Sequence, residues 1–92
     1  NTTPFYVDFI VKFKDGRIGL FDPHSTHLAD FGAKSDGLQK YIKDENKKGK
    51  KLFGGIVANT DERTYNGRWV YFTENSKKFT KGEFGNWIDL EL

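Results

Sequence analysis

Asp8 and Asp22 flank a segment that predicts a β-hairpin, so two carboxylates could lie side by side. Neighbouring carboxylates repel each other, and burial in an apolar sheet increases the cost. A divalent cation is the simplest way to offset that cost, and hard oxygen ligands select Mg²⁺ or Mn²⁺, ions that act on phosphate. The spacing alone is a weak signal because surface hairpins often carry two acids, but these two have apolar neighbours.

The length of the hairpin loop decides whether the two acids share a face. Residues 5–13 and 17–22 are rich in β-forming side chains on either side of an Asp-Gly turn signal. A two-residue loop would point Asp8 and Asp22 to opposite faces. A three-residue loop over residues 14–16, closed by a glycine in the left-handed region, places them opposite each other. We favour the three-residue loop.

The favoured register predicts two apolar faces, and therefore a sheet covered on both sides. One face carries Phe9, Val11, Phe13 and Phe21, and the other carries Ile10, Ile18 and Leu20 beside the two acids.

A helix is predicted after the hairpin because Leu38, Tyr41 and Ile42 have helical spacing and Phe31 precedes Leu38 by seven residues. Ser35 or Asp36 could cap its start, and Gly49 could end it after Lys47 and Lys48 as a left-handed terminator.

A short apolar run over residues 52–59 follows this helix. The order strand, helix, strand predicts a parallel crossover. Next comes a hairpin-like segment with Asn66-Gly67 as its turn signal and a strand over residues 68–73, and residues 77–92 predict a loop with a short packed element. The expected fold is α/β, with a small mixed sheet and one main crossover helix.

Six lysines against two acids give residues 40–51 a local charge of +4, although the whole chain carries only +2. The commoner explanation is a solvated helix end whose cations lie near the negative end of the helix dipole. The functional explanation is a phosphate-contacting surface with steeply salt-dependent binding. The candidate nucleic-acid contacts are Lys47, Lys48, Lys50 and Lys51.

The pattern of Asp8, a hairpin and Asp22-Pro23-His24 resembles the PD-(D/E)XK restriction-endonuclease-like nucleases. Residues 7–22, 37–43 and 50–57 look like the C-terminal nuclease region of type III restriction enzyme Res subunits and related helicase-nuclease proteins. The resemblance covers roughly residues 5–58. It implies a truncated restriction-endonuclease-like core that hydrolyses DNA phosphodiester bonds with Mg²⁺ or Mn²⁺.

Carried over by position, the resemblance makes Asp8 and Asp22 metal ligands and the carbonyl of Pro23 a third. It places Gln39 near the site. Two residues depart from the family's pattern. Val7 stands where the family usually has Pro, which is a small difference. His24 stands where the family has its catalytic Lys, a larger difference because that Lys provides a cation or a base beside the attacking water.

Histidine is in general mostly neutral at pH 7, so three roles stay open for His24. Between two carboxylates it could stay protonated and partly replace the Lys. Beside a bound cation it could be neutral and act as a ligand or a base. The site could also be inactive, which leaves a catalytically degenerate nuclease-fold module used for DNA or subunit binding as the alternative function. A general single-strand binder is a third class.

Other constellations have commoner explanations. Asp22, His24 and His27 have the spacing of a transition-metal site, but histidines in polar loops are usually solvent-exposed. Ser25 is adjacent to His24 in sequence, which does not give the geometry of a nucleophile and its base.

Two further motifs point to packing. Gly54-Gly55 precedes a strand, so it predicts close packing or a bulge and not a phosphate loop. Trp69, Tyr71 and Phe72 could stack on bases, but their alternation favours one core aromatic and one covering aromatic.

Length and composition predict one domain over residues 1–92. The 36% hydrophobic and 16% aromatic content excludes a disordered tail. No stretch is apolar enough for a membrane helix, and the absence of cysteine excludes a disulfide scaffold.

Because the chain opens with Asn1 and has no Met, we expect a piece excised from a longer protein. The expected partners are DNA, the helicase/ATPase portion of a bacterial cytoplasmic parent, a modification subunit, and a second copy covering exposed apolar surface.

Overall fold

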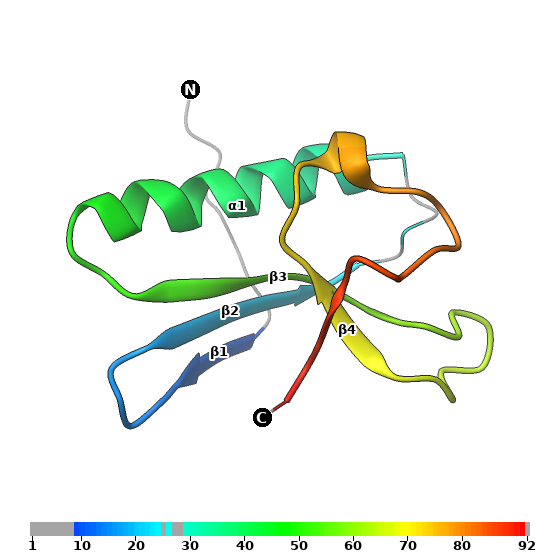
Figure 1. The fold of residues 1–92 in the computed structure, drawn as a ribbon, viewed down its shortest axis with the longest axis horizontal. Coiled ribbons are helices and arrows are strands. Elements are labelled where there is room, and N and C mark those ends of the chain that lie inside the picture. Colours follow the sequence, from blue (N-terminus) through cyan, green and yellow to red (C-terminus); the bar gives the residue numbers. More distant parts are fainter. Residues whose placement is uncertain (1–8, 25, 27–28, 92) are drawn as a thin grey trace.

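The computed structural model describes residues 9–24, 26 and 29–91. Figure 1 shows their arrangement. In chain order the elements are β1 (Phe9–Lys12), β2 (Ile18–Pro23), α1 (Phe31–Lys47), β3 (Leu52–Asn59), β4 (Trp69–Phe72), the 3₁₀ turn η1 (Ser76–Lys78) and β5 (Ile88–Asp89).

The strands form a five-stranded mixed sheet in the order β1-β2-β3-β4-β5. β2 and β3 are parallel and are joined through α1, while the other neighbours are antiparallel. This arrangement confirms the expected α/β class, the mixed sheet and the crossover helix.

The β1–β2 hairpin has the predicted three-residue loop. The amide of Phe13 donates to the carbonyl of Arg17 at 2.9 Å, and the amide of Gly16 donates back to Phe13 at 3.1 Å. Gly16 has φ +94°, a backbone conformation that side chains disfavour. The register pairs Phe9 with Phe21 and Ile10 with Leu20.

Helix α1 begins earlier than its cap signals indicated. Its first residue is Phe31, so the expectation that Ser35 or Asp36 caps the helix is wrong. Ser35 is instead part of the buried stripe, which also contains Phe31, Leu38 and Ile42. Asp36 accepts hydrogen bonds from the amide and the hydroxyl of Ser76, at 2.9 and 2.6 Å, and so fastens η1 to the helix. The end of the helix is as predicted, with Gly49 at φ +99°.

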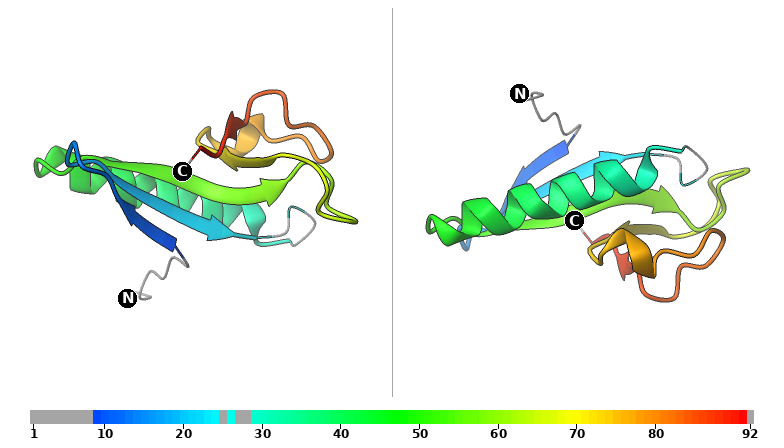
Figure 2. Two further views of the ribbon diagram at one scale, coloured as in Figure 1. Left: turned by 90° about the horizontal axis from the view of Figure 1, so that it is seen from below. Right: turned by 90° about the horizontal axis from the view of Figure 1, so that it is seen from above.

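The hydrophobic core lies between α1 and one face of the sheet. Figure 2 shows the strands in front of α1 from below and behind it from above. The core residues are Leu20, Phe31, Leu38, Ile42, Leu52, Ile56, Ala58, Val70, Phe72 and Trp87, with Phe79 and Phe84 packed against them. The C-terminal aromatics therefore form the predicted packed element.

The opposite face of the sheet is only partly covered by the described residues. Phe9 and Trp69 on that face are 55% and 46% exposed. On the helix side, Ile10 is 60% exposed because it lies on the edge strand. The centre of this face is nevertheless buried, with Phe21 2% and Val57 4% exposed, so the expectation of a sheet covered on both sides is confirmed only in part for the described residues.

Gly54 and Gly55 lie where neighbouring strands approach closely. A Cβ at Gly54, which has φ +129°, would collide with the carbonyl of Leu20, and a Cβ at Gly55 would collide with the carbonyl of Phe72. The prediction of close packing at this pair is confirmed.

The β3–β4 connection is longer than a tight hairpin. It spans residues 60–68, so Asn66-Gly67 does not form a two-residue turn although the two strands do pair as expected. Its left-handed residue is Tyr65, with φ +59°. The geometry of this loop depends on Asn59, which lies at the end of β3.

Candidate functional site

Asp22 lies near the carboxyl end of β2 and is 7% exposed. Its side chain shares a strand face with that of Leu20, because the two residues are two positions apart, and Leu20 belongs to the core under α1. Asp8, the other predicted ligand, lies outside the described residues.

Asp22 forms an ion pair with a lysine of helix α1. Nζ of Lys34 is 3.7 Å from Oδ2 of Asp22, and the Lys34 side chain is half exposed. A helix that starts at Ser35 or Asp36 would leave this lysine outside it, so Lys34 is not among the predicted site residues. A signal was present in the spacing of Phe31, Lys34 and Leu38, which sets Lys34 beside the buried stripe once the helix starts at Phe31.

His24 follows β2 and is turned towards the start of α1. Its Nε2 is 2.9 Å from Oδ1 of Asp30, the residue before the helix, and its side chain is 12% exposed. The hydrogen bond with His24 holds the pKa of Asp30 below its usual range. Asp30 thus places a carboxylate at the positive end of the helix dipole.

The loop after His24 is tied to the β3–β4 connection. Thr26 donates to Glu62 from its hydroxyl at 2.5 Å and from its amide at 3.2 Å. Ser25 and His27 lie outside the described residues, so the hydrolase and transition-metal hypotheses stay untested. Among residues 9–24, 26 and 29–91, no three His, Asp or Glu side chains come together as metal ligands do.

The donors at the end of β2 fit Mg²⁺ or Mn²⁺ only in part. Asp22 offers a buried carboxylate, and Pro23, paired with Val57 at the end of the strand, offers a backbone carbonyl. Both are hard oxygen donors of the kind these ions prefer. Another carboxylate is needed, and Asp8 is the residue that the sequence provides for it.

Gln39 links the helix to the middle of the sheet. Its Nε2 donates to the carbonyl of Gly54 at 2.9 Å and to that of Phe72 at 3.2 Å. Gly54 pairs with Leu20, two positions before Asp22 along β2. The described contacts of Gln39 are therefore structural, and its role at the site remains a prediction.

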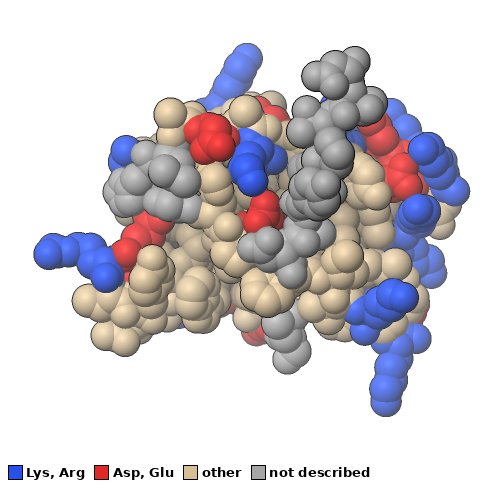
Figure 3. Space-filling view, turned by 180° about the vertical axis from the view of Figure 1, so that it is seen from behind, with Lys and Arg blue, Asp and Glu red and all other residues tan. Residues whose placement is uncertain are grey.

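The lysine-rich surface lies at the opposite end of α1 from Asp22. Figure 3 shows Lys and Arg side chains gathered at one end of the face it presents. Lys47 ends the helix, and the carbonyl of Lys51 accepts from the amide of Ile18 at the beginning of β2. Since α1 starts beside Asp22 and rises about 1.5 Å per residue, Lys47 is about 24 Å along the helix axis from Phe31.

Part of this lysine charge is paired within the chain. Glu45 contacts Nζ of Lys50 at 2.8 Å and of Lys48 at 3.0 Å. The hydrogen bond with Glu45 raises the pKa of Lys50, and the same contacts lower the pKa of Glu45. This pairing matches the commoner explanation of a solvated helix end, and DNA contact by Lys47, Lys48, Lys50 and Lys51 remains a prediction.

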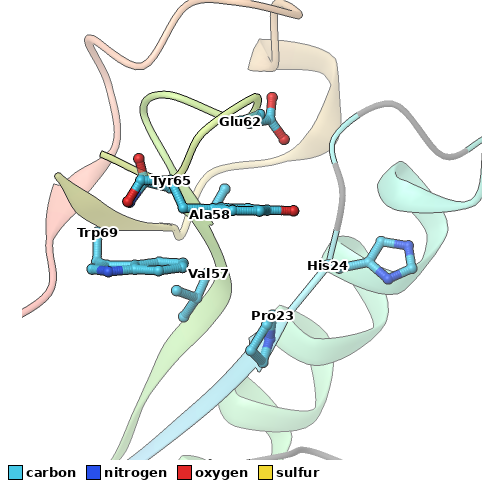
Figure 4. A pocket seen from close by; sticks show the side chains of 8 residues that line it. Pro23, His24, Val57, Ala58, Glu62, Tyr65 and Trp69 are labelled. Carbon is cyan, nitrogen blue, oxygen red and sulfur yellow. The ribbon is translucent and has the colours of Figure 1, made fainter. Parts of the chain in front are cut away.

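Beside the candidate site lies a pocket lined by Tyr65 and Trp69 (Figure 4). Phe72 is fully buried in the core, Tyr71 lies on the opposite face of the sheet against Phe21, and Trp69 stacks on Tyr65. The predicted alternation of core and covering aromatics is confirmed for Phe72, but the stacking of Trp69 on Tyr65 was not predicted.

Comparison of the chain with protein-family models, curated proteins and solved structures found no match. Within the described part of the chain, no helix combines the length and the apolar character needed to cross a membrane.

Proposed function

We propose that this chain is a metal-dependent DNA endonuclease domain of a restriction or helicase-nuclease protein. The proposal is carried by the buried carboxylate of Asp22 at a strand end, with the Lys34 ammonium 3.7 Å away. An acid that holds a metal and a cation beside it are the groups that phosphodiester hydrolysis needs. Asp8 completes the proposed ligand set with the carbonyl of Pro23.

The hairpin register supports the pairing of the two acids. Paired residues in β1 and β2 run from Lys12 with Ile18 to Phe9 with Phe21, one step at a time. This is the register on which the predicted meeting of Asp8 with Asp22 depends, and Asp8 itself lies outside the described residues. A bound Mg²⁺ or Mn²⁺ would polarise the phosphate and lower the pKa of an attacking water. Lys34 takes the part that the motif Lys has in the family, as a positive charge beside the phosphate.

Cleavage of supercoiled plasmid DNA with Mg²⁺ or Mn²⁺ tests the proposal. We expect the wild-type chain to nick the plasmid and Asp22→Asn and Asp8→Asn to lose that activity. Asp44→Asn is the matched control, because Asp44 is also paired with a lysine of α1, at 2.6 Å, but lies near the far end of the helix. Equal nicking by Asp22→Asn and Asp44→Asn would refute the proposal.

The alternative is a catalytically degenerate nuclease-fold module used for DNA or subunit binding. One observation favours it: His24 is engaged by Asp30, so the residue at the motif position is not free to act on water. If the wild-type chain does not cut and His24→Lys does, the degenerate module is the better account.

A further inference from the structure

Tyr65 and Trp69 present two aromatic rings at the surface. Their planes are 8° from parallel with centroids 6.2 Å apart, and the residues are 63% and 46% exposed. The aromatic pairs around Phe72 and Trp87, in contrast, are buried in the core. Exposed ring faces are open to stacking by another flat group.

The backbone that carries these rings is held firmly. Asn59 is 1% exposed, and its Oδ1 accepts from the amides of Asp61 at 2.9 Å and Gly67 at 2.8 Å. Its Nδ2 donates to the carbonyls of Gly67 at 3.1 Å and Tyr65 at 3.3 Å. The amide of Tyr65 also donates to Asp61 at 2.8 Å.

This network maintains Tyr65 at φ +59°, in the left-handed region that tyrosine rarely adopts. Strained backbone of this kind concentrates at binding sites, where the surrounding structure holds it in place. The ring of Tyr65 is therefore pre-positioned, and a ligand that stacks on it would not have to order the loop.

A pocket of about 260 Å³ adjoins the rings. In Figure 4, Tyr65 and Trp69 lie on one side of it, Val57 and Pro23 below, and Glu62 above, while His24 points away towards α1. This volume is just below the usual range for ligand pockets, about 300–1,000 Å³. A single ring-sized group matches this space better than a whole cofactor.

The acids of the loop are occupied within the chain. Asp61 accepts from the amides of Arg63 and Thr64 and from the Thr64 hydroxyl, and Glu62 binds Thr26. The hydrogen bonds to Asp61 keep the pKa of its carboxyl group below its usual range. The largest contribution comes from the Thr64 hydroxyl, followed by the backbone amide of Thr64. Arg63 is exposed and has no ion pair among the described contacts, so its guanidinium can contact a phosphate.

We propose that the Tyr65–Trp69 pair stacks on an unpaired base of single-stranded DNA beside the candidate cleavage site. The inference rests on the proposed function, because it takes DNA as the ligand. Stacking tolerates every base, since each has a π-face. The pair therefore orients a strand leaving the site and does not read its sequence.

Two oligonucleotides of equal length test the inference on the full chain. One is an eight-nucleotide oligothymidylate and the other is its abasic counterpart, both end-labelled and titrated without metal so that cleavage does not interfere. By fluorescence anisotropy, the thymidylate binds more tightly than the abasic strand. Trp69→Leu, which keeps apolar bulk without a ring, weakens thymidylate binding about 5- to 150-fold, the equivalent of ~1–3 kcal/mol per stacked base.

Further variants separate stacking from loss of structure. Tyr65→Phe retains binding and Tyr65→Leu loses it, while Tyr41→Leu, at an aromatic 40% exposed on α1, leaves it unchanged. Equal affinity for both oligonucleotides, or equal losses for Trp69→Leu and Tyr41→Leu, overturns the inference. An oligomer in sedimentation that dissociates in Trp69→Leu also overturns it, because it assigns the rings to a contact between copies.

Plasmid nicking measured in parallel distinguishes the two proposals. If the chain nicks the plasmid but binds the thymidylate and the abasic strand equally, the stacking inference fails and the endonuclease proposal stands. Preference for the thymidylate that depends on Trp69, without nicking, means that the endonuclease fails and the stacking inference stands.

Discussion

Lys34 on α1 extends its ammonium to within 3.7 Å of the buried carboxylate of Asp22 on β2. The first turn of the helix thereby supplies a positive charge to the end of the strand where the motif residue is His24 and not Lys. A cation and an acid that are twelve positions apart in sequence meet because the chain turns back after β2, so that the first turn of α1 lies beside Asp22.

Replacing Lys34 by methionine keeps much of the side chain's length and removes its charge. We expect Lys34→Met to reduce plasmid nicking about 10²–10³-fold, the usual loss when one group that stabilises transition-state charge is removed. Lys40→Met is the control, because Lys40 on the same helix pairs with Asp44 at 2.6 Å away from the site. Equal rates for the two variants would show that Lys34 only neutralises Asp22.

The contact between His24 and Asp30 predicts a pH effect. His24→Phe removes the hydrogen bond that lowers the pKa of Asp30, so that pKa should return towards its ordinary value of 3.8. A lowered carboxyl pKa in the folded state stabilises the protein above the ordinary value, and this stabilisation is lost as the pH falls through the lowered pKa.

Carboxyl chemical shifts in an NMR titration measure this change directly. Asp61 is the internal control, because Thr64 and not His24 lowers its pKa. The wild-type chain should lose its advantage in unfolding free energy over His24→Phe only below about pH 4. An unchanged Asp30 titration in His24→Phe would contradict the assigned contact.

Gln39 should matter for stability whether or not the site is active. Gln39→Leu leaves the carbonyls of Gly54 and Phe72 without the donor they share, which should lower the unfolding free energy by about 1–3 kcal/mol in urea denaturation. Lys43→Ala, at an exposed position of the same helix, should change it by no more than about 0.5 kcal/mol. Full stability combined with lost nicking would instead favour the role at the site that the resemblance implies.

Ser35 offers a stabilising substitution. Its hydroxyl is buried in α1 and has no hydrogen-bond partner among the described residues. Ser35→Ala removes that unsatisfied group and improves helix propensity, so the unfolding free energy should rise by about 1 kcal/mol. Ser76→Ala, which loses a hydrogen bond to Asp36, should lower it by about 0.5–1.5 kcal/mol. Thermal unfolding of both variants should therefore shift in opposite directions, and a lower midpoint for Ser35→Ala would argue for an undetected partner.

The hairpin could be predicted from sequence because its determinants are local. Gly16 provides the left-handed residue of the loop, and the side chains on either side of it specify the register. The parallel pairing of β2 and β3 follows equally from the order strand, helix, strand.

The start of α1 could not be predicted from its capping residues. Ser35 and Asp36 are both residue types that cap helices well. A helix that starts at Phe31, however, buries more apolar surface than one that starts at Ser35 or Asp36, because it includes the ring of Phe31. The partner of Asp36 is Ser76, forty positions later. Lys34 was missed for the same reason.

The β3–β4 loop shows the same limit of local signals. Asn66-Gly67 is a strong turn signal, but the side chain of Asn59 organises the whole connection and places the unusual backbone at Tyr65. A buried asparagine with several backbone partners leaves no periodic pattern in a sequence.

Helix α1 also fixes a length. Along the helix axis, Lys47 is about 24 Å from the first turn, which lies beside Asp22. This distance equals the rise of about seven base pairs of duplex DNA. If a duplex lay along α1 with its phosphates bound at Lys47, it would reach Asp22 about two-thirds of a DNA turn away. The length of α1 would then set the distance between the phosphate contact and the cleaved bond.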